Sequence, residues 1–93
     1  MKRVLLRSPA FARAARRILK RDSSLVDAVK ITLDLLEKDA FHPQLRTHQL
    51  KGRLKGSWSC SAGYDLRIVF NFVQHRGSEA ILLLTMGSHD EVY

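Results

Sequence analysis

The chain has 93 residues, 45% of them hydrophobic, and carries 16 lysines and arginines against 9 acidic residues, a net charge of +7. This length predicts a single domain, residues 1–93, because two halves would each be too small to bury a useful core. No apolar run is long enough to span a membrane, and the one cysteine, Cys60, cannot form an internal disulfide, so we expect a cytoplasmic protein rather than a membrane-embedded or disulfide-stapled one.

Basic residues are distributed unevenly along the chain. Residues 1–21 contain eight lysines and arginines and no acidic residue, and residues 46–55 contain four more, again with no acid. A solvated helix face would explain the first cluster, and so would a docking surface for RNA or for an acidic protein. The charge indicates a polyanionic partner without deciding between nucleic acid, ribosome and acidic protein.

The first elements in chain order are a short strand and a helix. Residues 2–7 predict the strand, because their centre is apolar. Ser8 and Pro9 predict the start of the helix, with the serine as N-cap and the proline at the first helical position. Apolar residues then recur at three- and four-residue spacing and indicate one buried helix face; they are Phe11, Ala14, Ala15, Ile18 and Leu19.

A second helix is predicted directly afterwards. Residues 22–24 break the first helix, and Ser24 followed by Asp27 resembles a capping box, with Asp in place of the usual Glu or Gln. Apolar residues at helical spacing continue to about Asp39. The short connection predicts an antiparallel helical hairpin, whose apolar sides require a sheet to cover them.

The second half of the chain predicts that sheet. Four segments are expected as strands, namely residues 48–50, 58–61, 65–73 and 79–86, with turns at the glycines between them. Residues 81–84 are expected in a central strand that is buried on both faces. Strand, two-helix hairpin and an antiparallel sheet of three to four strands packed on the helices make an α+β fold.

Four short segments of the second half resemble one family of proteins. They are His48–Gly52, Gly56–Trp58, Tyr64–Phe70 and Gly87–Tyr93. In this order and spacing they are similar to the RelE/ParE superfamily of bacterial toxins, and in particular to its YafQ-like branch. The similarity covers about residues 40–93, and the first half agrees in its architecture.

The resemblance implies a function and a set of residues. It implies a toxin of a type II toxin-antitoxin system, which cleaves mRNA in the decoding site of the ribosome and is held inactive by a cognate antitoxin. The family's active-site positions fall on four residues of this chain, namely His48, Asp65, His89 and Tyr93. One family histidine is replaced here by Ser61 and one tryptophan by Leu66, so the chain departs from the family pattern at these two positions.

The same residues suit RNA cleavage without a metal ion or cofactor. Attack of a 2′-hydroxyl on phosphate needs a base and an acid, and two histidines, His48 and His89, can supply both. A guanidinium such as that of Arg67 can grip the phosphate, unless it pairs with a helix carboxylate such as Glu37. Asp65 would orient a histidine or act as base, and Tyr93 would stack on a base unless it frays as a chain end.

The remaining assignments concern binding and alternatives. Three basic residues, Lys51, Arg53 and Lys55, would follow the RNA backbone, and Trp58 is assigned to structural packing. The spacing of histidines and of the cysteine predicts no metal site. Two other functions stay open, a ParE-like inhibitor of DNA gyrase on the same fold and a basic RNA- or ribosome-binding module without catalysis. The pair of histidines favours the endoribonuclease, because a gyrase inhibitor does not need proton-transfer groups.

Overall fold

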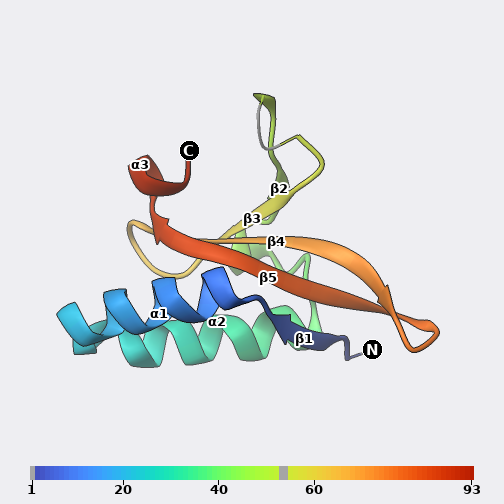
Figure 1. Ribbon diagram of the computed structural model, residues 1–93, viewed down its shortest axis with the longest axis horizontal. Helices are drawn as coiled ribbons and strands as arrows, with labels where there is room; N and C mark the ends of the chain where they lie inside the picture. Colours follow the sequence, from blue (N-terminus) through green and yellow to red (C-terminus); the bar gives the residue numbers. More distant parts are fainter. Residues whose placement is uncertain (1, 53–54) are drawn as a thin grey trace.

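The computed structural model describes residues 2–52 and 55–93 and has an α+β architecture, which confirms the predicted fold class. Two helical segments lie on one side of a sheet, and the C-terminal turn lies on the other side (Figure 1). The elements in chain order are β1 (Val4–Arg7), α1 (Pro9–Arg21), η1 (Ser23–Leu25), α2 (Val26–Lys38), η2 (Pro43–Leu45), β2 (His48–Gln49), β3 (Trp58–Ser61), β4 (Leu66–His75), β5 (Ser78–Ser88) and α3 (His89–Val92).

The sheet has five strands in the order β1-β5-β4-β3-β2. The strands β2 to β5 pair with one another in antiparallel fashion, as predicted, and β1 pairs with β5 in parallel. At the end of β1 the Ser8 amide donates to the carbonyl of Leu83 at 3.1 Å, and the Ser8 hydroxyl donates to that of Leu84 at 3.0 Å. Ser8 thus joins the start of the first helix to the sheet.

The first helix starts as predicted, whereas the predicted capping box of the second is wrong. The Ser8 hydroxyl accepts the Phe11 amide at 3.0 Å, and Pro9 is the first residue of α1. At the second helix the residue before α2 is Leu25, which makes no side-chain cap. The Asp22 carboxylate instead accepts the Ser24 amide at 3.1 Å and caps η1. The turn η1 leads directly into α2, so Ser24 is no longer in the capping position.

The hydrophobic core lies between the helices and one face of the sheet. Phe11 and Ile18 of α1 and Leu36 of α2 pack there against Ile68 and Phe70 of the sheet. Residues 81–84 were expected to be buried on both faces, and this expectation is wrong for half of them. Ile81 and Leu83 are fully buried and Leu82 and Leu84 are half-buried, since the helices cover only one face.

The hairpin of β4 and β5 is longer than predicted. It runs from Leu66 to Ser88 and turns at Arg76 and Gly77, whose φ angles are 53° and 80°. Two successive residues with positive φ match the twist of the flanking strands and make a tight two-residue turn. The register of the pair shifts between Val69 and Phe70. No helix within the described ranges 2–52 and 55–93 is long and apolar enough to cross a membrane.

Candidate active site

The candidate residues gather on the sheet face that α1 and α2 leave uncovered, which we call the open face. His48 pairs with Ser59, Ser59 with Val69, and Val69 with Thr85. Residues paired across strands share a face, and residues two apart on one strand do as well. Arg67 therefore lies on the same face as His48 and Ser59, opposite to the face that carries Cys60 and Ile68.

The short helix α3 brings His89 and Tyr93 to this face. The Tyr93 hydroxyl contacts the hydroxyl of Ser59 and lies 3.4 Å from His48 Nε2. The Tyr93 ring is 6.2 Å from the His48 ring and 4.5 Å from the His89 ring between centroids, with edge-on geometry in both pairs. The two imidazoles thus meet around one phenol ring, although 40 residues separate them in the sequence. Tyr93 is packed in place rather than frayed.

A hydrogen bond to the main chain orients His48. Its Nδ1 lies 3.0 Å from the carbonyl oxygen of Arg46, a residue in the left-handed region with φ 52°. A carbonyl can only accept, so Nδ1 carries the hydrogen and Nε2 of the neutral ring is the acceptor. This is the nitrogen that faces the Tyr93 hydroxyl.

Ser59 is a site residue that the sequence analysis missed. It is completely buried, and its hydroxyl holds that of Tyr93. One signal could have found it. In the segment from Trp58 to Ser61 apolar side chains alternate with serines, which places Ser59 and Ser61 on the face opposite to Trp58 and Cys60.

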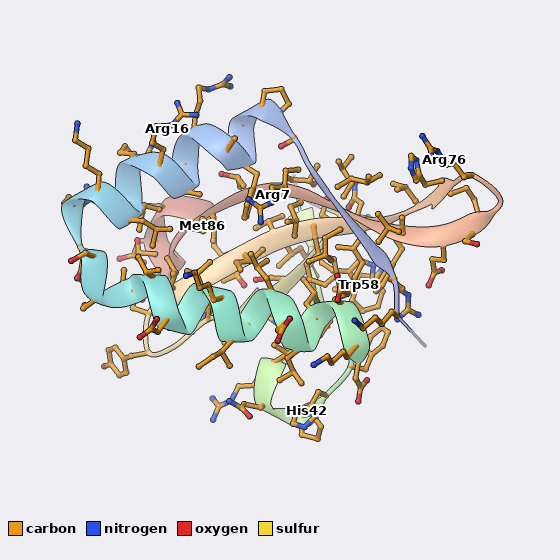
Figure 2. The ribbon with its side chains drawn as sticks, turned by 90° about the horizontal axis from the view of Figure 1, so that it is seen from below. Arg7, Arg16, His42, Trp58, Arg76 and Met86 are labelled. Atoms are coloured by element: carbon orange, nitrogen blue, oxygen red, sulfur yellow. The ribbon has the colours of Figure 1, made fainter. Side chains whose placement is uncertain are left out.

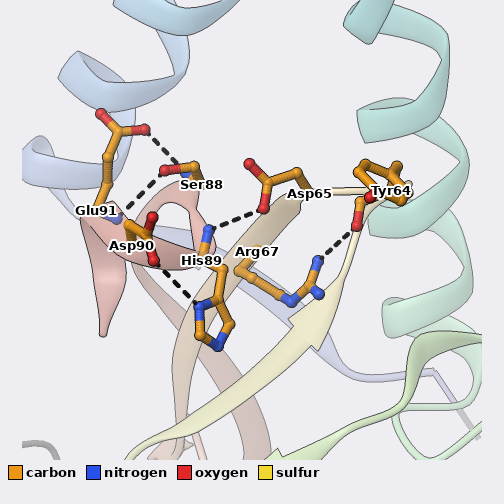
Figure 3. Close-up of polar contacts among 7 residues, drawn as sticks. All are labelled: Tyr64, Asp65, Arg67, Ser88, His89, Asp90 and Glu91. Atoms are coloured by element: carbon orange, nitrogen blue, oxygen red, sulfur yellow. Dashed lines mark hydrogen bonds and ion pairs between the residues drawn. The ribbon is translucent and has the colours of Figure 1, made fainter.

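Asp65 contacts the main chain of His89 rather than its imidazole. The His89 amide donates to the Asp65 carbonyl oxygen at 3.1 Å and faces its carboxylate Oδ1 at 3.4 Å. The His89 ring has its Nδ1 3.6 Å from the carboxylate of Asp90 (Figure 3). Asp65 is therefore placed to fix where α3 begins, and with it the position of the ring.

The guanidinium of Arg67 lies on the open face and binds main-chain carbonyl groups. Its Nη1 donates to the carbonyl oxygens of Leu66 at 3.1 Å and of Tyr64 at 3.4 Å. In the part of the chain that the structure describes, Arg67 forms no ion pair, and the alternative partner Glu37 pairs with Lys2 at 3.5 Å instead. Figure 3 shows the guanidinium extending from beside His89 toward Tyr64. Its charge is therefore available to an anion.

A capping box locks α3. The Ser88 hydroxyl accepts the Glu91 amide at 3.2 Å, and the Ser88 amide donates to Glu91 Oε1 at 2.9 Å. Hydrogen bonds from the backbone and the side chain of Ser88 to the Glu91 carboxylate, and the charges of Arg21 and Arg17, lower the pKa of Glu91 from its ordinary value. A side chain at Gly87 would place its Cβ 3.1 Å from that of Glu91, which is closer than the packing allows without a shift.

The basic residues have different surroundings. Lys51 and Lys55 are exposed between β2 and β3, and Arg53 lies outside the described residues. In the N-terminal cluster Arg3 pairs with Glu79 at 2.7 Å and lies over the ring of Phe72 at 5.2 Å.

Two other assigned residues lie outside the open-face group. Trp58 packs edge-on against Phe41 and Phe72, in keeping with a structural part. Burial raises the pKa of Cys60 to about 12, against the opposing charge of Arg67, so its thiol stays protonated. Among residues 2–52 and 55–93, no three histidine, cysteine or acidic side chains lie close enough to hold a metal ion.

Comparisons with known proteins agree with this architecture. No curated protein sequence matched the chain. The structure is similar to that of YafQ from Escherichia coli strain BL21(DE3), with a TM-score of 0.77, 16% identity and 99% of each chain covered. It is also similar to YafQ in the E. coli DinJ–YafQ toxin-antitoxin complex, with a TM-score of 0.75, 16% identity and 100% and 99% of the two chains covered.

A further similar structure has a higher sequence identity. It is a conserved hypothetical protein from Helicobacter pylori, with a TM-score of 0.73, 28% identity and 100% of each chain covered. The family model of YafQ, a bacterial toxin of type II toxin-antitoxin systems, matches residues 3–93. The chain therefore belongs to the YafQ family of bacterial toxins.

Proposed function

We propose that this toxin is a ribosome-dependent endoribonuclease of a single domain that cleaves mRNA without a metal ion. The observation that carries the proposal is the meeting of His48 and His89 around Tyr93, with the guanidinium of Arg67 on the same sheet face. Two groups that transfer protons and one fixed cation are what the cleavage of a phosphodiester by its own 2′-hydroxyl requires.

The geometry supports a division of roles. His48 Nε2, the ring nitrogen without a hydrogen, removes the proton of the 2′-hydroxyl as its oxygen attacks phosphorus. The bond from phosphorus to the 5′-oxygen breaks, and His89 gives that oxygen a proton. The products are a 2′,3′-cyclic phosphate and a free 5′-hydroxyl. Arg67 neutralises the non-bridging oxygens, where negative charge grows in the transition state.

Other residues support this reaction by position or by binding. Asp65 holds the main chain of His89 in place, and Ser59 holds Tyr93. The Tyr93 ring, 39% exposed, is available to stack on a base next to the cleaved bond. The basic residues in the sequence between β2 and β3 would bind the phosphate backbone of the message; they are Lys51, Arg53 and Lys55.

An antitoxin partner in the cytoplasm is part of the proposal. The E. coli relative is found in a complex with DinJ, and the chain described here carries a net charge of +7. An acidic segment of the antitoxin would be attracted to the open face by its charge and would hide the imidazoles from RNA.

The test is the mapping of RNA ends on programmed ribosomes. Purified toxin should produce new message ends in the decoding site, each with a cyclic phosphate, and prior dialysis of the toxin against EDTA should leave the rate unchanged. A message with a 2′-deoxy sugar at the cleaved position should stay intact. No new ends at toxin concentrations that occupy the ribosome would refute the proposal. Inhibition of gyrase supercoiling that survives His48→Ala combined with His89→Ala would instead favour the ParE-like function.

A further inference from the structure

A pocket of about 510 Å³ adjoins the open face where α2, η2 and the connection from β3 to β4 meet. Ligand sites in proteins have volumes of roughly 300–1,000 Å³, so this pocket has room for a small ligand. The lining residues that matter here are Ile31 of α2, Gln44 and Leu45 of η2, Arg46 after it, and Tyr64 and Arg67.

The lining combines positive charge with exposed apolar surface. Arg46 and Arg67 contribute guanidinium groups, and no carboxylate lines the pocket in the described part of the chain. Leu45 is 1% exposed, whereas Ile31 and Tyr64 are 60% and 100% exposed. A fully exposed aromatic ring beside two cations suits a ligand that has both a flat ring and a phosphate.

The pocket is continuous with the candidate active site. Arg67 belongs to both, because its guanidinium extends from beside His89 to the carbonyl oxygen of Tyr64 (Figure 3). Arg46 lines the pocket, and its carbonyl oxygen accepts a hydrogen bond from His48 Nδ1 at 3.0 Å. An RNA strand lying across the imidazoles would therefore reach the pocket with a nucleotide next to the cleaved bond.

We propose that this pocket binds one nucleotide that flanks the cleaved phosphodiester in single-stranded RNA, and so selects where the message is cut. The inference rests on the proposed endoribonuclease function. Arg46 and Arg67 hold the phosphate and Tyr64 stacks on the base. Gln44, exposed at the pocket with a donor and an acceptor in its amide, reads the edge of that base.

The chain offers a matched pair of variants for the test. Arg46 and Arg76 are both exposed arginines with nearly equal positive φ angles, 52° and 53°. Asparagine tolerates this conformation, so Arg46→Asn and Arg76→Asn remove the same charge with the same demand on the backbone. Figure 2 shows Arg76 at the tip of the β4–β5 hairpin, remote from His42, which precedes η2.

The first measurement is the affinity for a mixed pool of single-stranded hexanucleotide RNA with 2′-O-methyl sugars, which lack the attacking hydroxyl and bind without being cut. Arg46→Asn should weaken binding roughly tenfold, the scale of one hydrogen bond to a charged group. It should also reduce the slope of log K against log salt by about 0.7. Arg76→Asn should change affinity less than about twofold. Equal losses in the two variants, or no binding by the wild type, would overturn the inference.

The second measurement is the map of cut positions along a natural message. Tyr64→Leu removes a fully exposed ring, so it should leave the fold intact, weaken binding roughly fivefold or more, and redistribute the cuts. Unchanged affinity and cut positions would refute the pocket while the endoribonuclease function stands. Binding that depends on Arg46 and Tyr64 in a wild type that never cuts would refute the function and retain the pocket.

Discussion

The two faces of the sheet differ in what their residues do, although the residues alternate along the same strands. Cys60 points into the core, where burial raises the pKa of its thiol to about 12. Its neighbour Ser59 points to the open face and holds the hydroxyl of Tyr93. Both side chains are fully buried, so burial alone does not distinguish a packing residue from a site residue. Substitutions on the helix-covered face should change stability, and those on the open face should change the reaction.

The largest effect is expected for a core residue of the covered face. Phe70→Ala should lower the free energy of unfolding by about 3–5 kcal/mol, because it removes a fully buried ring and leaves a cavity. Urea unfolding followed by circular dichroism measures this loss. The fraction that remains folded should cleave RNA at the normal rate. A loss below about 1 kcal/mol would show that the covered face does not carry the core.

The next effect is expected at an imidazole of the open face. His89→Ala should slow cleavage by roughly 10²-fold or more, the usual scale for a positioned acid or base. Its unfolding midpoint should stay close to that of the wild type, because the side chain is exposed. His75→Ala on the β4–β5 hairpin is the control and should keep the full rate. Equal cleavage rates for the two variants would show that His89 takes no part in the reaction.

A smaller and sharper contrast comes from the neighbours Ser59 and Cys60. Ser59→Ala should slow cleavage up to about tenfold, because Tyr93 loses a hydrogen bond worth about 1 kcal/mol and the ring is no longer fixed. Cys60→Ala should lower stability by about 1 kcal/mol and leave the rate per folded molecule unchanged. Single-turnover rates and urea midpoints of the two variants decide this. If both variants lose only stability, or both lose only the cleavage rate, the contrast between the two faces of the sheet is refuted.

The smallest effect concerns the pH dependence of the α3 lock. The pKa of Glu91 is lowered in the folded state, so its contribution is present above the unfolded pKa and is lost as pH falls through the folded one. NMR titration should give a midpoint below that of glutamate in an unfolded peptide, and amide exchange of α3 should rise in acid. Arg17→Ala should move the midpoint upward, because its guanidinium lies 3.9 Å from the carboxylate. A titration midpoint of Glu91 at or above the value in an unfolded peptide would show that its carboxylate does not take part in the capping box of α3.

The predictable parts of the molecule are those that depend on neighbours in the sequence. Ser8 and Pro9 begin α1 as expected, because an N-cap serine satisfies an amide three residues ahead. The capping box at Ser24 and Asp27 is wrong, because Ser24 lies inside the turn η1, which Asp22 caps and which leads directly into α2. The four segments of the second half indicated the toxin family, which the match over residues 3–93 confirms.

The sequence by itself determined the α+β class, the helical hairpin and the histidines, aspartate, arginine and tyrosine that are candidates for chemistry. Only the tertiary structure decided that Asp65 holds the main chain of His89, that Ser59 anchors Tyr93, and that Arg67 points toward Tyr64. The physical reason is the distance along the sequence between the residues that interact. Caps and turns join residues a few positions apart, whereas Tyr93 meets His48 across 45 positions. Such contacts depend on strand register and on the fold-back of α3, which no local pattern encodes.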